Sequence, residues 1–123
     1  VIYQIPLGLG VIDAAITTID KVKAKQNGCN EYLQTQSCDL QQKRNALKAR
    51  VTELTHGAPL VDICQARLDA VHATLEATQA SMLHTGAAGY VAGSKPSRLL
   101  RESYFFASLT PTVRHLEKLI QTQ

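Results

Sequence analysis

The clearest pattern along the chain is a leucine at every seventh residue of a segment otherwise rich in polar side chains. The repeat consists of Leu33, Leu40, Leu47 and Leu54. This spacing places the leucines on one face of a helix, where they pack against another helix. It predicts a helix over residues 31–56, and Pro59 then favours the start of a second long helix over residues 59–85. Because the connection between them is so short, we expect an antiparallel hairpin.

Apolar residues at helical spacing predict three further helices. Ile12, Ala15 and Ile19 indicate a helix over residues 11–27, which ends at an Asn-Gly pair. Proline near the first helical position predicts helices over residues 97–108 and 111–122. The predicted fold class is therefore all-α, a four- to five-helix bundle built on the long hairpin, with residues 1–123 in a single helical domain.

Residues 1–10 are predicted to form an extended arm. Val, Ile and Tyr favour extended backbone, and Pro6 disfavours helix at the residue before it. Gln4, Pro6, Gly8 and Gly10 interrupt the apolar stretch Val1–Ile12, which is too short and too broken to span a bilayer. The arm is also too apolar to remain in water, so we expect it to pack on its own bundle or on a neighbouring subunit.

Composition narrows the classes of partner. The chain is 45% hydrophobic and 19% charged, which is typical of a globular domain. Its net charge of +3 is mild, whereas nucleic-acid-binding modules usually carry a strong basic patch on one face. We therefore expect no nucleic-acid partner.

No motif for catalysis, metal binding or nucleotide binding is recognisable. His56, His72, His84 and His115 do not have the spacings that zinc sites use. The glycine-rich loop at residues 89–95 has Ser before Lys, the reverse of the phosphate-binding order, and it follows a helix rather than a strand. The sequence predicts a non-catalytic protein without a cofactor, and no small-molecule substrate is evident.

Three cysteines leave the redox state open. Cys29 and Cys38 are a possible disulfide pair, but only if the helix is broken between them, since one continuous helix would hold their Cα atoms about 13 Å apart. Cys64 is expected to be a small buried hydrophobe. One bridge with one thiol suits an oxidising compartment, and three thiols suit a reducing one.

The candidate partner contacts are apolar residues that are not assigned to the core of the predicted bundle. Tyr104 and Phe105 precede Phe106, and three successive aromatic residues cannot all face one core. The predicted contacts are Ile2, Tyr3, Ile5, Leu7, Tyr104 and Phe105. They favour an interaction or assembly subunit that binds a protein partner, or forms a homo-oligomer, by helix-in-groove recognition.

Two alternatives remain at this level. The run LGLGVIDAAI at residues 7–16, followed by lysines, is compatible with a helix in a membrane interface. It resembles the first helix of the four-helix domains of cell-death executioners in the HeLo and mixed-lineage-kinase-like group, which implies a membrane-associating bundle. The other alternative is a secreted or periplasmic accessory protein with one disulfide.

Overall fold

The computed structural model describes residues 2–23 and 26–122, and these residues confirm an all-helical fold. None of the described residues lies in a strand. The α-helices are α1 (Ile5–Val22), α2 (Ser37–Leu54), α3 (Leu60–Thr85), α4 (Lys95–Ser108) and α5 (Val113–Gln121). Three short 3-10 segments accompany them, namely η1 (Ile2–Gln4), η2 (Gln26–Tyr32) and η3 (Gly86–Tyr90).

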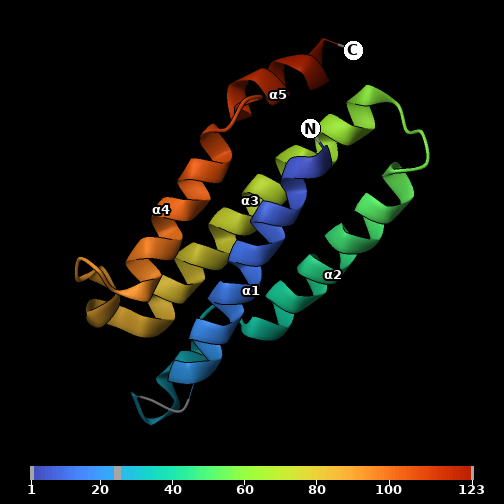
Figure 1. The fold of residues 1–123 in the computed structure, drawn as a ribbon. Coiled ribbons are helices and arrows are strands. Elements are labelled where there is room, and N and C mark those ends of the chain that lie inside the picture. The colour runs from blue at the N-terminus through green and yellow to red at the C-terminus, as the bar shows by residue number, and fades with distance from the viewer. Residues whose placement is uncertain (1, 24–25, 123) are drawn as a thin grey trace.

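Helix α3 is the longest element and lies at the centre of the arrangement (Figure 1). It packs most extensively against α1, then against α4, and it also contacts α2 and α5. The main core joins α1, α2, α3 and α4. A smaller cluster of Cys64, Leu68 and Leu116 holds α5 on the first half of α3. The best-packed pair is therefore α1 with α3, rather than the α2–α3 pair that the leucine repeat emphasised.

The prediction of an extended arm is wrong for residues 2–10, and residue 1 lies outside the described residues. Residues 2–4 form η1 and α1 begins at Ile5, with Pro6 in its first turn, where proline is well tolerated. Ile5 and Leu9 are buried in the main core. The burial of this apolar face outweighs the low helix propensity of the two glycines, which costs about 1 kcal/mol each.

The predicted helix over residues 31–56 starts too early. Helix α2 begins at Ser37, because the side chain of Gln36 donates to the carbonyl oxygens of Asn30 and Leu33 at 2.9 and 2.7 Å and so stabilises the preceding turn. The backbone N–H of Gln36 in turn donates to the Asp39 carboxylate at 3.1 Å. Of the leucine repeat, Leu40 and Leu47 are buried, whereas Leu33 and Leu54 are half-buried.

The other boundaries differ less. Predicted helices 59–85 and 97–108 correspond to α3 and α4, and Ser94 caps α4 by accepting from the N–H of Ser97 at 3.3 Å. The predicted helix 111–122 begins at Val113 instead, with Thr112 as its N-cap. The predicted helix 11–27 overlaps α1 only over residues 11–22, because α1 begins at Ile5 and ends at Val22; residues 24 and 25 lie outside the described residues, and residues 26–27 belong to η2.

Residues Ile2–Val22 form a helical segment of 21 residues that is long and apolar enough to cross a membrane by length and composition. The shorter apolar stretch at its start was predicted not to span a bilayer; the structure places Pro6, Gly8 and Gly10 of that stretch inside this longer helix. In the folded chain the apolar face of this helix packs inside the protein, since Ile5, Ile12 and Ile19 are buried in the core. Such burial is typical of a core helix.

Candidate interaction surface

The structure divides the six predicted contact residues into two groups. Ile5 is 0% exposed and Ile2 packs against the core, so the prediction that Ile5 contacts a partner is wrong. Both belong to the helical stripe that faces α3. Tyr3, Leu7, Tyr104 and Phe105 remain exposed. Phe106 is buried, which confirms that the three successive aromatic residues cannot share one core.

Leu7 and Phe105 face a common hollow between α1 and α4, called here the α1–α4 groove. Its volume is about 340 Å³. It is lined by Leu7, Gly10, Val11, Glu102, Phe105, Phe106 and Leu109. Leu7 is 56% exposed and Phe105 is 67% exposed, so both walls present apolar surface to the outside. Tyr3 and Tyr104 do not line this groove.

Sequence reasoning missed the other lining residues because it treated residues 1–10 as extended. Once that segment is helical, Leu7, Gly10 and Val11 fall at the i, i+3, i+4 spacing of one helix face. Glu102 and Phe105 have the i, i+3 spacing on α4, and Leu109 follows as the C-cap of that helix. This spacing places each set of residues on one helix face, but it does not reveal that the two faces meet.

Two glycines on α1 have opposite surroundings. A Cβ atom at Gly8 would lie 2.6 Å from Cε2 of Phe106, so only glycine allows α1 and α4 to approach this closely. A Cβ atom at Gly10 would meet no atom within 4 Å. Gly10 therefore serves no internal contact, and it leaves the backbone of α1 open at the floor of the groove.

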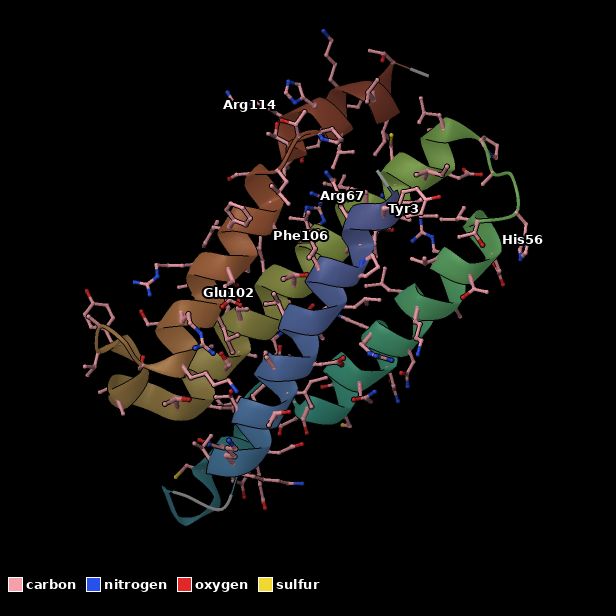
Figure 2. The ribbon with its side chains drawn as sticks, in the orientation of Figure 1. Tyr3, His56, Arg67, Glu102, Phe106 and Arg114 are labelled. Atoms are coloured by element: carbon pink, nitrogen blue, oxygen red, sulfur yellow. The ribbon has the colours of Figure 1, made fainter. Side chains whose placement is uncertain are left out.

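A buried arginine, Arg67, contacts Phe106, which lines the groove (Figure 2). The guanidinium of Arg67, from α3, donates to the Gln4 side chain at 2.9 Å and to the Phe106 carbonyl oxygen at 2.8 Å. It also lies over the Phe106 ring. Desolvation by burial lowers the pKa of Arg67. Because the Phe106 carbonyl is near the C-terminus of α4, the negative end of that helix dipole compensates the charge.

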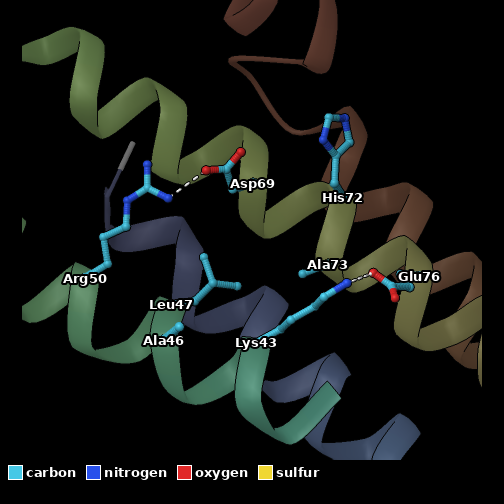
Figure 3. A pocket seen from close by; sticks show the side chains of 8 residues that line it. All are labelled: Lys43, Ala46, Leu47, Arg50, Asp69, His72, Ala73 and Glu76. Carbon is cyan, nitrogen blue, oxygen red and sulfur yellow. Dashed lines mark hydrogen bonds and ion pairs between the residues drawn. The ribbon is translucent and has the colours of Figure 1, made fainter. Parts of the chain in front are cut away.

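A second hollow, of about 310 Å³, lies between α2 and α3 (Figure 3). The ion pairs Lys43–Glu76 and Arg50–Asp69 flank it. Leu47, Ala46 and Ala73 form apolar parts of its lining, and His72 stands at its edge. Each of these pairs joins a cation of α2 to a carboxylate of α3. The carboxylates are engaged with cations, so this hollow is primarily a joint between helices.

A polar junction lies at the C-terminal end of α1, away from the α1–α4 groove. The Asn30 side chain donates to the carbonyl oxygens of Val22 and His84, at 3.3 and 2.9 Å. The His84 ring nitrogen Nε2 lies 2.8 Å from the carbonyl oxygen of Thr35, an acceptor, so Nε2 carries the proton. Asn30 thereby satisfies carbonyl groups at the ends of α1 and α3, a role that sequence spacing does not reveal.

All three cysteines are free thiols in the structure. Cys29 lies on η2 and Cys38 on the first turn of α2, and both are exposed. The helix is broken between them, which is the condition that a Cys29–Cys38 bridge requires, so that bridge stays a prediction. Cys64 is buried as expected, but it packs against Leu116 of α5.

Within residues 2–23 and 26–122, no cluster of three His, Cys, Asp or Glu side chains is placed to hold a metal ion. Comparison with known proteins adds no assignment: no family model, curated protein or solved structure matches this chain. The α1–α4 groove is therefore the strongest candidate site on geometric grounds.

Proposed function

We propose that this chain is a non-catalytic interaction subunit that binds a partner protein in the α1–α4 groove. The observation that carries this proposal is the convergence of exposed Leu7 and Phe105 on one apolar hollow, from helices far apart in the sequence. Large apolar side chains exposed together, with few polar groups between them, mark an interaction surface.

The occupant that best fits the groove is an amphipathic helix of another protein. Two parallel walls from neighbouring helices accept apolar anchors spaced at i, i+3 and i+4. The open backbone at Gly10 allows the partner helix to approach closely, because no Cβ atom intervenes. Glu102, the charged residue of the lining, already pairs with Arg98 at 3.3 Å, so apolar contacts rather than charge carry the fit to the partner.

We further propose that α2 and α3 form an antiparallel hairpin that supports this surface from behind. Two ion pairs support the register: Lys43 pairs with Glu76 and Arg50 pairs with Asp69, so residue numbers rise along α2 as they fall along α3. The bidentate pair of Arg44 with Asp13, at 2.9 and 3.2 Å, ties this hairpin to α1. The α2–α3 hairpin is thereby connected to α1, which forms one wall of the groove.

Site-specific photocrosslinking tests the proposal in the full chain. A photoreactive benzoylphenylalanine replaces Phe105, and in a parallel variant it replaces the exposed Tyr32 on η2 as the matched control. We expect a crosslinked protein only from position 105. That protein is then purified, and its affinity is measured for the wild type, Leu7→Ala and Phe105→Ala chains.

Truncation of an apolar anchor in a desolvated groove is expected to weaken binding at least about tenfold. Tyr32→Ala should leave the affinity unchanged. An affinity that does not respond to Leu7→Ala or Phe105→Ala would refute the groove as the binding site. If the crosslinked protein is a second copy of this chain, the groove mediates self-association instead of binding a different protein.

A further inference from the structure

We propose that the loop between α3 and α4 inserts into anionic lipid membranes. The loop segment, residues 86–93 with the sequence GAAGYVAG, is called here the apolar tip. Tyr90 is 84% exposed and Val91 is 62% exposed, and Ala87, Ala88 and Ala92 are exposed beside them. No charged residue occurs from Thr85 to Ser94. This surface is separate from the α1–α4 groove, because it precedes α4 whereas the groove uses the second half of that helix.

Two glycines bound the apolar tip. Gly86 and Gly93 have positive φ angles of 76° and 86°, and between them η3 forms a short 3-10 turn. Gly89 is the buried member of the segment, since a Cβ atom there would lie 3.3 Å from Met82, Pro96 and Thr85. With Gly89 packed inward, Tyr90 and Val91 face outward.

The polar backbone of the tip is partly satisfied from within. The Ser94 hydroxyl donates to the carbonyl oxygen of Gly89 at 2.7 Å, and the Ser94 N–H donates to that of Val91 at 3.1 Å. Backbone groups without partners are costly in lipid, so internal hydrogen bonds lower the cost of insertion. A protruding apolar surface of this kind needs no complementary shape in a lipid bilayer, whereas a protein partner would need a matching pocket.

Basic residues follow the tip directly. Helix α4 carries Lys95, Arg98 and Arg101 against a single acid, Glu102, which pairs with Arg98 at 3.3 Å. Lys95 and Arg98 lie within the first turn or so of α4, inside the roughly 10 Å over which surface charges act at physiological salt. Each cation near an anionic leaflet contributes about 1 kcal/mol of attraction. Charge complementarity thus selects anionic lipid.

Figure 1 shows the loop protruding at the end of the bundle that lies away from α5 and the N-terminus. Tyr3, labelled in Figure 2, lies near that N-terminus and is 90% exposed. It is therefore a matched control for Tyr90. Both tyrosines are exposed, and replacing either one should not disturb the fold.

The chain contains no tryptophan, so Tyr90→Trp and Tyr3→Trp each create a single fluorescent reporter. We expect vesicles of phosphatidylcholine with phosphatidylserine to shift the emission of Tyr90→Trp to shorter wavelength, because the indole enters the bilayer. Neutral phosphatidylcholine vesicles should shift it less, and Tyr3→Trp should not respond. An unshifted Tyr90→Trp spectrum, or an equal shift in Tyr3→Trp, overturns the proposal.

Co-sedimentation with the same vesicles gives the affinity. Tyr90→Ser with Val91→Ser is expected to weaken partitioning at least about tenfold, as loss of two inserted side chains implies. Lys95→Gln should weaken it about fivefold. Leu7→Ser should bind vesicles as the wild type does, so failure of the groove proposal and failure of this one are distinguishable. Partitioning that survives the tip double substitution would assign membrane binding to another surface.

Discussion

The guanidinium of Arg67 lies 4.0 Å from the centre of the Phe106 ring. It is 0% exposed, and it also donates to the carbonyl oxygen of the same residue. One charged side chain thus fixes both the ring and the backbone of Phe106, and Phe106 forms part of the α1–α4 groove. The end of α4 is positioned from α3 by this contact.

We expect Arg67→Ala to lower the free energy of unfolding by about 2–5 kcal/mol, because it leaves a cavity and removes donors from one buried and one partly buried acceptor. Urea denaturation followed by circular dichroism measures the loss. The control is Arg101→Ala on the exposed side of α4, which should change the free energy by less than about 0.5 kcal/mol. Equal effects of the two substitutions would show that the buried contact contributes nothing specific.

Gly8 and Gly10 give a second prediction with opposite signs. Gly8→Ala should destabilise the chain by about 1–3 kcal/mol, since its methyl group would overlap the Phe106 ring. Gly10→Ala should stabilise it by up to about 1 kcal/mol, because alanine is the better helix former and its methyl group meets nothing. Thermal unfolding of both variants checks the signs. A stabilising Gly8→Ala would contradict the close packing of α1 on α4.

The same glycines show why the start of the chain was mispredicted. Pro6, Gly8 and Gly10 all argue against helix locally, and the sequence pattern offered nothing to outweigh them. Tertiary packing compensates for this low helix propensity, because Gly8 packs against Phe106, which lies on a helix near the other end of the sequence. No local pattern contains that contact. The position of α2 is a similar case, because the side-chain hydrogen bonds of Gln36 delay the start of that helix.

Features that depend on periodicity alone were predictable. The extent of α3 follows from Pro59 and the glycine at its end. The outward placement of Phe105 beside buried Phe106 follows from helix geometry. The groove itself was half predictable. Leu7 and Phe105 were both singled out, but their convergence requires the packing of α1 against α4.

Asn30 is expected to be among the most sensitive polar positions. Asn30→Ala removes the donor to two helix-terminal carbonyl groups and should cost about 1–3 kcal/mol. Asn30→Asp should cost more, because a carboxylate would face the carbonyl oxygens of Val22 and His84. Equilibrium unfolding in urea measures both. Asn45→Ala on the exposed face of α2 is the control, and an Asn30→Asp variant no less stable than Asn30→Ala would refute this junction.

Thiol reactivity distinguishes the three cysteines. Cys29 and Cys38 are exposed and should react rapidly with an aromatic disulfide reagent, whereas Cys64 should react only on unfolding. Leu116→Ala should accelerate the third reaction, since Leu116 covers Cys64. Stopped-flow absorbance counts the fast and slow thiols. A single reactive thiol after complete unfolding would instead show that Cys29 and Cys38 are bridged.

The register of α2 against α3 is tested by a double-mutant cycle on Arg50 and Asp69. Their side chains pair at 2.6 Å and are partly exposed, so the coupling free energy is expected to be about 0.2–1 kcal/mol. The coupling should fall as salt is added, because the pair is accessible to counter-ions. Arg50→Ala, Asp69→Ala and the double variant supply the cycle by urea denaturation. Gln65 also donates to Asp69, at 2.9 Å, so the single Arg50 variant does not strand the carboxylate.

Asp62 provides the control for this cycle. It lies seven residues before Asp69 on α3, about 10 Å along the helix axis, so its coupling to Arg50 should be close to zero. If α2 were displaced by two turns along α3, the larger coupling would move from Asp69 to Asp62. A coupling free energy at Asp62 that exceeds the one at Asp69 would therefore overturn the proposed hairpin register. A larger coupling free energy at Asp69 would support that register.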